Sequence, residues 1–277
     1  MVVAIPDTTL CCVDCSAYEL AARAMSISLA QCRFDRAILF TDVPMNVAGV
    51  EVHRIPTIGS IDEYSQFLLK DLRHHITTRF ALVIQWDGYV IDASQWRSDF
   101  HDYDYIGARW PHVPGIEVGN GGFSLRSRRL LDACADERFV VSNPEDAAIC
   151  INNRTFLERQ MGIRFAPPDV AERFSFERTR DSGPHFGFHG LFNIPNVMPD
   201  AELSTFLAAL PARVAWMGEL FEVLLVYATT GRRNEARKTW RWATQFRAEA
   251  EMVSFLREHV RPSDAGEWII CELTAAA

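Results

Sequence analysis

Short apolar runs alternate with amphipathic helical patterns along most of the chain. Four runs predict strands over residues 9–13, 37–41, 50–55 and 80–84. The run 80–84 is apolar at every position, as expected of a strand buried on both faces of a mostly parallel sheet. Shorter strands are predicted over residues 103–108 and 122–125.

Helix-start signals fall between these runs. Ser16 with Glu19, and Ser60 with Glu63, form capping boxes, and the first helix should extend to about Cys32. The second box precedes apolar residues at helical spacing, namely Tyr64, Phe67, Leu68, Leu72 and Ile76. The alternation of strands and helices predicts an α/β fold.

A third helix should begin at Asn143. This residue has the side chain of an N-cap, and Pro144 follows at the position that suits the first helical residue. Strand signals stop near residue 199, and three helical stretches follow, at 201–210, 214–229 and 232–259. We therefore predict an α/β domain over residues 1–198 and a C-terminal helical region over residues 199–277.

Composition agrees with a globular protein. The chain has 277 residues, of which 48% are hydrophobic and 23% charged, enough for one large α/β domain with an appendage. The net charge of −8, with no block of basic residues interleaved with aromatic ones, does not favour a nucleic-acid partner.

The sequence predicts a cytoplasmic protein without a membrane span. The N-terminus lacks the basic and apolar pattern of an export signal, and no run of about 18 apolar residues occurs. The seven cysteines are odd in number and scattered, which favours reduced thiols over a disulfide framework. The pair Cys12 and Cys15 has CxxC spacing, but a single such pair is weak evidence for a metal or redox site.

Asp87 is the first candidate for chemistry. It follows the most apolar predicted strand, and ligands of open α/β sheets bind beyond the carboxyl ends of the strands. A carboxylate there can hold a divalent metal, although an Asp-Gly turn with Gly88 is a common structural alternative. The pair Asp102 and Asp104 also has Asp-x-Asp spacing, but it precedes a predicted strand, so its position argues against a ligand role.

Three further features carry polar or flexible residues. Gly119, Asn120, Gly121 and Gly122 form a glycine-rich segment that lets backbone approach a ligand closely. Glu145 and Asp146 lie in the first turn of the third predicted helix, where an acid is either a general base or simply stabilised by the helix dipole. His189 lies beside a glycine and is a candidate metal ligand or a simple hydrogen-bonded histidine.

Together these segments resemble a bacterial domain family of unknown function that is usually described as glycosyltransferase-like. The resemblance covers residues 10–195 and lies in the segments 60–64, 83–88, 103–107, 119–126 and 145–146. It implies a fold like that of the GT-A glycosyltransferases, which is Rossmann-like, with a mostly parallel mixed sheet flanked by helices. It also implies a nucleotide-sugar donor and a divalent metal, manganese or magnesium.

The resemblance assigns roles by motif. Asp87 resembles the last carboxylate of the metal-binding Asp-x-Asp element, and His189 resembles the later metal-ligand histidine of some GT-A enzymes. Asp146 or Glu145 resembles the catalytic base. Gln85 stands where the first aspartate of the element is expected, which leaves fewer charged ligands.

The donor and acceptor should then be bound by a larger set of residues. This set comprises the two predicted strand ends and the glycine-rich segment: Asp14, Gln85, Trp86, Asp87, Gly119, Asn120, Gly121 and Gly122.

The sequence thus predicts transfer of a sugar from a nucleotide diphosphate to a hydroxyl of a glycan, polysaccharide or small molecule, with inversion favoured by a single acidic base. Two alternatives remain open. One is a catalytically inactive nucleotide-sugar or glycan-binding module that docks a partner enzyme through its helical tail. The other is a nucleotidyltransferase, although the chain lacks the basic, glycine-rich loop expected after the first strand.

Overall fold

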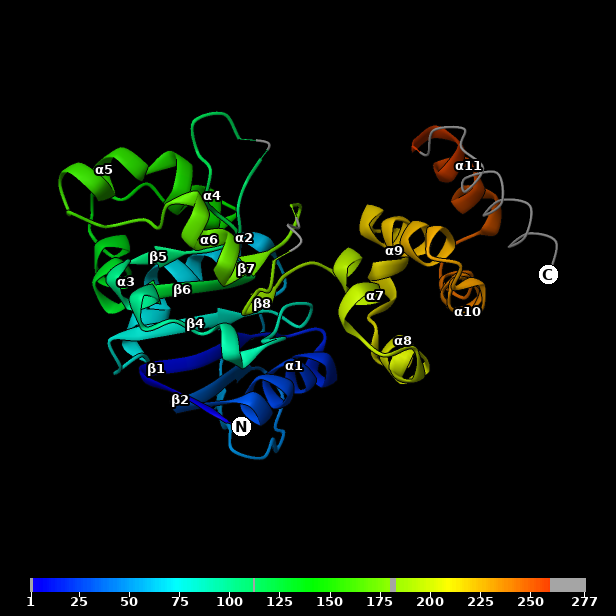
Figure 1. Ribbon diagram of the computed structural model, residues 1–277, viewed down its shortest axis with the longest axis horizontal. Helices are drawn as coiled ribbons and strands as arrows, with labels where there is room; N and C mark the ends of the chain where they lie inside the picture. Colours follow the sequence, from blue (N-terminus) through cyan, green and yellow to red (C-terminus); the bar gives the residue numbers. More distant parts are fainter. Residues whose placement is uncertain (1, 112, 180–182, 260–277) are drawn as a thin grey trace. The chain divides into compact units, whose positions relative to one another are not determined.

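The computed structural model describes residues 2–111, 113–179 and 183–259 (Figure 1). The chain divides into two compact units, Met1–His189 and Gly190–Ala277. The predicted boundary between residues 198 and 199 lies nine residues beyond this division.

A six-stranded sheet organises the first unit. Its order is β3-β2-β1-β4-β6-β5, and five of these strands follow one another in Figure 1 as β2, β1, β4, β6 and β5. The strands are β1 (Val3–Val13), β2 (Cys32–Thr41), β3 (Glu51–Arg54), β4 (Phe80–Ile84), β5 (Tyr105–Ile106) and β6 (Phe123–Ser127). The first four are parallel, whereas β6 runs antiparallel to both β4 and β5. The prediction of an α/β fold with a mostly parallel mixed sheet flanked by helices is confirmed.

The central strand β4 has the predicted bounds, and every one of its residues is buried. β1 and β2 are longer than predicted because Val3, Ala4 and Ile5 pair with the start of β2 ahead of the apolar run, across an irregularity between Ile5 and Thr9. Pro6, Asp7 and Thr8 separate these three apolar residues from the main apolar run, so hydrophobicity did not reveal them as part of the same strand.

A continuous helical segment covers one face of the sheet. It comprises α2 (Ile61–Gln66), the π-helical η1 (Phe67–Asp71) and the 3₁₀ turn η2 (Leu72–His74). The predicted apolar positions Phe67, Leu68, Leu72 and Ile76 pack with residues of β1, β2 and β4 and with Leu131 of α3 (Arg128–Cys134). The helical spacing thus identified the buried face correctly.

The second capping box forms in part. Ser60 Oγ accepts a hydrogen bond from the Glu63 N–H at 3.2 Å, as predicted. The Glu63 carboxylate accepts from the Gly59 N–H at 2.7 Å, one residue before the position expected for the reciprocal bond. The helix start is therefore right, and its reciprocal contact lies one residue earlier.

The first capping box does not form. The helix α1 (Tyr18–Gln31) begins after Ala17, and no side chain of the predicted pair caps it. The Asp14 carboxylate instead accepts hydrogen bonds from the N–H groups of Ser16 and Ala17. An aspartate at the end of a strand can satisfy these groups from a tight turn, which removes the need for a serine cap.

The helix predicted at Asn143 also starts differently. Pro144 occupies the N-cap position, and the helix comprises α4 (Glu145–Ala147) continued by the π-helical η5 (Ala148–Asn152). The Asn143 side chain donates to Asp62 of α2 rather than capping the helix. The prediction of a helix beginning with acidic residues is right, but its cap is not.

The rest of the first unit consists of two helices and a small second sheet. The helices α5 (Arg154–Arg159) and α6 (Pro168–Phe174) lead to a two-stranded parallel sheet of β7 (Ser175–Phe176) and β8 (Gly187–Phe188). His189 follows β8 directly and ends the unit.

The described residues of the second unit, up to His259, form helices. Its helices are α7 (Ile194–Val197), α8 (Leu203–Ala209), α9 (Gly218–Thr229), α10 (Arg233–Ala243) and α11 (Glu249–His259). The stretch predicted as one helix over residues 232–259 divides into α10 and α11. Within residues 2–259, no described helix has both the length and the apolar content needed to cross a membrane.

Candidate functional site

The order of the main sheet places two strand ends side by side. β1 and β4 are neighbours, although β2 and β3 continue the sheet on one side and β6 and β5 on the other. In open α/β sheets, ligands bind outside the carboxyl ends of strands where the strand order reverses in this way. Because Cys12 pairs with Ile84, Asp14 and Gln85 both emerge at that edge.

Asp14 is largely committed to the start of α1. Its Oδ1 accepts from two backbone N–H groups and lies 3.4 Å from Ser16 Oγ. Asp14 therefore shapes the loop at the carboxyl end of β1.

Asp87 lies buried after β4, with 6% of its surface exposed. Among the described residues, its Oδ1 has no hydrogen-bond partner, and His189 Nε2 lies 3.5 Å away. A buried carboxylate oxygen without a donor is costly unless a positive charge or a ligand compensates it. Trp86, just before it, is also buried, with 8% exposed.

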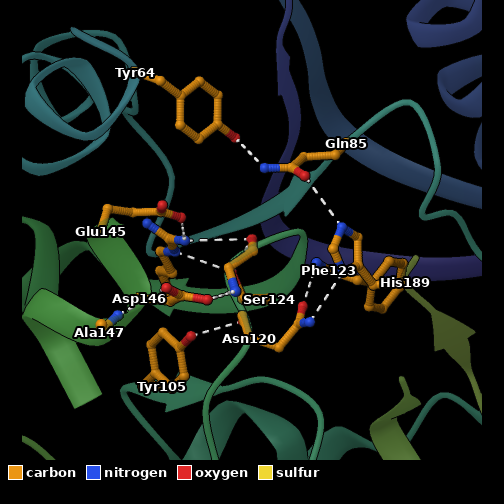
Figure 2. Close-up of polar contacts among 12 residues, drawn as sticks. Tyr64, Gln85, Tyr105, Asn120, Phe123, Ser124, Glu145, Asp146, Ala147 and His189 are labelled. Atoms are coloured by element: carbon orange, nitrogen blue, oxygen red, sulfur yellow. Dashed lines mark hydrogen bonds and ion pairs between the residues drawn. The ribbon is translucent and has the colours of Figure 1, made fainter. Parts of the chain in front are cut away.

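Figure 2 shows His189 between Gln85 and Asn120. Its Nε2 lies 3.1 Å from Gln85 Oε1, and its Nδ1 lies 3.4 Å from Glu177 Oε1 and 3.0 Å from Asn120 Nδ2. Two carboxylates, those of Asp87 and Glu177, thus flank a single imidazole from opposite ring nitrogens.

These carboxylates set the charge of the imidazole. Burial by itself lowers the pKa of His189, but the charges of Asp87 and Glu177 outweigh it and raise that pKa well above its usual value. Burial by itself raises the pKa of Glu177, but the hydrogen bond and positive charge of His189, with the hydrogen bond of Asn120, outweigh burial. The net shift of the Glu177 pKa is therefore downward. We therefore assign an imidazolium that donates from both nitrogens, with the Asn120 amide N–H directed to Glu177.

Gln85 connects this histidine to the helix α2. Its Oε1 accepts from His189 Nε2, and its Nε2 donates to the Tyr64 hydroxyl at 2.9 Å (Figure 2). An amide can accept on one side and donate on the other, which an ionised carboxylate cannot do. The residue that stands in place of the expected aspartate therefore has a specific bridging geometry here.

The glycine-rich segment packs directly against these side chains. A Cβ added at Gly122 would lie 2.0 Å from His189 Nε2, and one added at Gly121 would lie 2.1 Å from Glu145 Oε1. Gly119 approaches the Trp110 ring as closely, within 2.3 Å of the added Cβ. Glycine is required at these positions because any side chain would displace neighbouring groups.

Asn120 fixes the turn within this segment. Its φ of 72° lies in the left-handed region, which asparagine tolerates better than most residues. Its Oδ1 accepts from the Phe123 N–H at 3.2 Å, and its carbonyl accepts from the Tyr105 hydroxyl at 2.7 Å. The segment is therefore rigidly held where it meets β6.

Glu145 is paired with a buried arginine. Its Oε1 lies 2.9 Å from Arg126 Nη2, and both side chains are almost fully buried. Burial alone lowers the pKa of Arg126, but Glu145 and other neighbours raise it, so the guanidinium stays charged. Of the two predicted acids, Glu145 is therefore committed to an ion pair.

Asp146 has different surroundings. Its Oδ2 accepts from the Gly121 N–H at 2.9 Å, and its Oδ1 accepts from the Ala147 N–H at 2.8 Å. Burial, followed by the negative charge of Glu145, raises the pKa of Asp146 to about 6. A carboxylate with such a pKa is suited to accept a proton near neutral pH.

Asp87 is the residue that could hold a cation, and His189 could join it only as a neutral imidazole, after the Nε2 proton is lost. The orphaned Asp87 Oδ1 fits one, and a hard divalent ion bound by one or two protein ligands usually completes its coordination with phosphate oxygens and water. Across residues 2–259, the described side chains form no group of three or more acidic, histidine or cysteine residues suited to a metal. These residues therefore fit a metal only together with a phosphate-bearing ligand.

The competing acidic pair lies elsewhere. Asp104 precedes β5 and accepts a 2.6 Å hydrogen bond from Ser127 Oγ, and Ser127 pairs with Phe80 at the start of β4. Asp104 thus lies at the opposite edge of the sheet from Asp87. The two cysteines of the CxxC pair have different surroundings: Cys12 is fully buried within β1, whereas Cys15 lies after the end of that strand.

Three residues of this cluster were not predicted from the sequence. Tyr64 was counted only as an apolar position of a helix, and Arg126 only as part of the segment that carries the resemblance. Glu177 follows the two buried residues of β7, and an acid directly after a strand is the signal that also identified Asp87.

Comparison with known proteins gives a family but no activity. Residues 49–189, just over half of the chain, match a family described as "Protein of unknown function (DUF5672)". No curated protein sequence matches. One similar solved structure is the apo-form glycosyltransferase GlyE of Streptococcus pneumoniae TIGR4, with a TM-score of 0.40 and 12% identity over 66% of this chain and 54% of that one. This chain therefore spans about half the length of that glycosyltransferase.

Proposed function

Because the chain belongs to the DUF5672 family, whose function is unknown, we propose its activity from the site: transfer of a sugar from a nucleotide diphosphate to a hydroxyl acceptor. The observation that carries this proposal is the pair of unlike carboxylates beside one glycine-rich segment. Asp146 has the pKa of a base, whereas Asp87 is buried beside an imidazolium. A carboxylate whose pKa is raised towards neutrality is typical of a general base.

The proposed base is Asp146. The acceptor oxygen attacks the anomeric carbon, a new C–O bond forms, and the acceptor proton passes to the Asp146 carboxylate. The bond between the anomeric carbon and the diphosphate breaks, and its electron pair leaves with the diphosphate. Attack on the face opposite the leaving group would give inversion.

The leaving diphosphate requires positive charge or donors. The His189 imidazolium lies at the edge of the sheet where such ligands bind, and preorganised charge of this kind stabilises developing negative charge. A divalent metal held by Asp87, and by His189 once its Nε2 proton is lost, would supply the same neutralisation when bound. The sequence resemblance to GT-A glycosyltransferases supports this assignment of donor and leaving group.

A binding module without catalysis is the second candidate. Gln85 cannot supply the charge that the first aspartate of the expected element would, and Glu145 is committed to Arg126. The site would then hold a nucleotide sugar or glycan, with turnover absent and the helical unit available for a partner.

A donor panel separates these candidates. Purified protein is incubated with uridine, guanosine, cytidine and thymidine diphosphate sugars, with manganese or with a chelator, and released nucleotide diphosphate is measured. Slow hydrolysis of one donor that falls by about 10²–10⁴-fold in Asp146→Asn is the expected result. Binding of a donor by calorimetry with no hydrolysis under any condition would instead favour the module, and neither binding nor hydrolysis would reject both.

A further inference from the structure

A closed ring of contacts surrounds the proposed base. Arg126 Nη2 lies 2.9 Å from Glu145 Oε1 and donates to the Gly121 carbonyl at 3.3 Å. The N–H of the same glycine donates to Asp146, which is the next residue after Glu145. The ring therefore runs from arginine to glutamate, along the chain to aspartate, through glycine and back to arginine.

A second donor fixes the glycine in this ring. Ser124 Oγ donates to the Gly121 carbonyl at 3.1 Å, and Arg126 Nε donates to Ser124 Oγ at 3.0 Å. The carbonyl of Gly121 is thus held by two side chains of β6, while its N–H is directed at Asp146. Figure 2 shows Ser124 beside Glu145 and Asp146 in this region.

We propose that Arg126 and Glu145 are a positioning pair, which holds the Asp146 carboxylate against Gly121 in the geometry needed to accept the acceptor proton. This inference rests on the proposed function. Arg126 has no exposed surface and Glu145 only 3%, so neither side chain is placed to touch a substrate. Their effect must pass through Asp146 and the glycine-rich segment.

Stability alone does not account for this pair. A buried ion pair can often be replaced by apolar residues of similar volume without loss of stability, because removing both charges from water is expensive. Arg126 Nη1 is buried with no hydrogen-bond partner among the described residues, which adds to that expense. The geometry that the pair imposes on Gly121 and Asp146 is what an apolar pair could not supply.

The pair also sets the electrostatic surroundings of Asp146. The titratable groups that face it are Glu145 on its own helix, Cys150 on η5, Tyr105 on β5 and Arg126 on β6. Of these, Glu145 disfavours the charged carboxylate and Arg126 favours it. Replacing Glu145 by glutamine keeps an acceptor for the guanidinium and removes only the negative charge.

The experiment compares Glu145→Gln with wild type by two readouts. Carbon-13 NMR of aspartate-labelled protein follows the titration of Asp146, which is assigned by its loss in Asp146→Asn. The donor hydrolysis assay gives kcat and KM as functions of pH. We expect the Asp146 titration and the acid limb of the kcat profile to move together to lower pH, with donor KM changed less than about twofold.

Two further variants complete the design. Glu158→Gln removes the acid of an exposed Arg154–Glu158 ion pair and should leave both readouts unchanged. The double variant Arg126→Met with Glu145→Leu keeps an apolar core and should fold, but its kcat should fall at least tenfold because Asp146 is no longer held.

The outcomes separate this inference from the proposed function. An unchanged Asp146 titration in Glu145→Gln, or wild-type kcat in the folded double variant, would overturn the positioning role. If wild type shows no turnover with any donor, the function fails, whereas the NMR titration still decides whether the pair controls Asp146.

Discussion

At the scale of single residues, chemistry in this site depends on partners more than on residue type. Glu145 and Asp146 are neighbours in sequence, yet one is bound to Arg126 and the other accepts two backbone N–H groups. Gln85 departs from the expected aspartate, yet its amide joins Tyr64 to His189. The residue types alone made these positions candidates for the site. Their contacts in the structure distinguish which role each of them can take.

Asp146→Asn should stabilise the protein near neutral pH. The folded-state pKa of about 6 is raised above the ordinary value, so the stability linked to Asp146 is fully present below about pH 4 and is lost as pH rises through 6. The asparagine variant avoids this loss and, like the protonated acid, keeps one carbonyl acceptor for the two backbone N–H groups. We therefore expect it to be about 1–3 kcal/mol more stable than wild type at pH 7, a difference that vanishes near pH 4.

Urea denaturation at pH 4 and pH 7 measures this difference. Asp169→Asn, in an exposed helical position, is the control and should change the free energy of unfolding by less than about 0.5 kcal/mol at both pH values. A variant less stable than wild type at pH 7 would contradict an Asp146 carboxylate that is penalised by burial.

At the scale of elements, the site depends on a close approach between a loop and a strand end. The glycine-rich segment before β6 contacts His189, the residue directly after β8, although β6 and β8 belong to different sheets. This approach holds the imidazole between Gln85 and Glu177. The segment thus acts as a packing surface for the histidine as well as a loop.

Gly122→Ala should disturb this approach. The added methyl would lie 2.0 Å from His189 Nε2, so the imidazole or the loop must move, and overpacking of this kind costs about 1–3 kcal/mol. Donor affinity should fall together with thermal stability.

Gly183→Ala is the matched control, since its added methyl would meet nothing within 4 Å. Differential scanning fluorimetry and donor titration compare the two variants. Equal stability and donor binding in both would show that His189 is not held by this contact.

At the scale of the first unit as a whole, the two aspartates Asp87 and Asp104 lie at opposite ends of the strands of the sheet. Asp87 lies at the carboxyl ends of β1 and β4, whereas Asp104 lies at the opposite edge beside the start of β4. Both are buried aspartates, so burial alone does not tell them apart. The direction of the strands distinguishes them, because ligands bind at the carboxyl ends of parallel strands.

Asp87→Asn and Asp104→Asn should therefore behave differently. Asp104 accepts from Ser127 Oγ and from the Arg164 N–H, so its replacement should lower stability by about 1–3 kcal/mol while donor affinity is kept. Asp87→Asn should lose donor binding and, with it, the stabilisation of about 2.7 kcal/mol that a donor at a hundred times its Kd provides.

Thermal unfolding with and without the best donor, in manganese and in chelator, checks this pair of variants. Loss of the donor-induced rise in unfolding temperature in Asp104→Asn but not in Asp87→Asn would contradict this assignment. The donor would then bind near Asp104, at the opposite end of the strands.

The sequence by itself determined the α/β class, β4, the buried face of α2 and η1, and the candidates Asp87, Asp146 and His189. The elements follow from local periodicity, and Asp87 follows from the rule that ligands gather at strand ends. Asp146 was chosen as an acid in the first turn of a predicted helix, and His189 as a histidine beside a glycine. It misplaced the caps at Ser16 and Asn143 because a cap is chosen by whichever acceptor lies nearest, and Asp14 supplied it in the first case.

Only the tertiary structure decided which groups meet. Arg126 and Glu145 are separated by 19 positions and Gln85 and His189 by 104, so no local pattern links them. The pKa of Asp146 depends on burial beside Glu145, and the charge of His189 depends on two carboxylates from separate segments. The pKa of a side chain depends on its burial and on the charges around it. These come from segments far apart in the sequence, so they are known only once the fold is known.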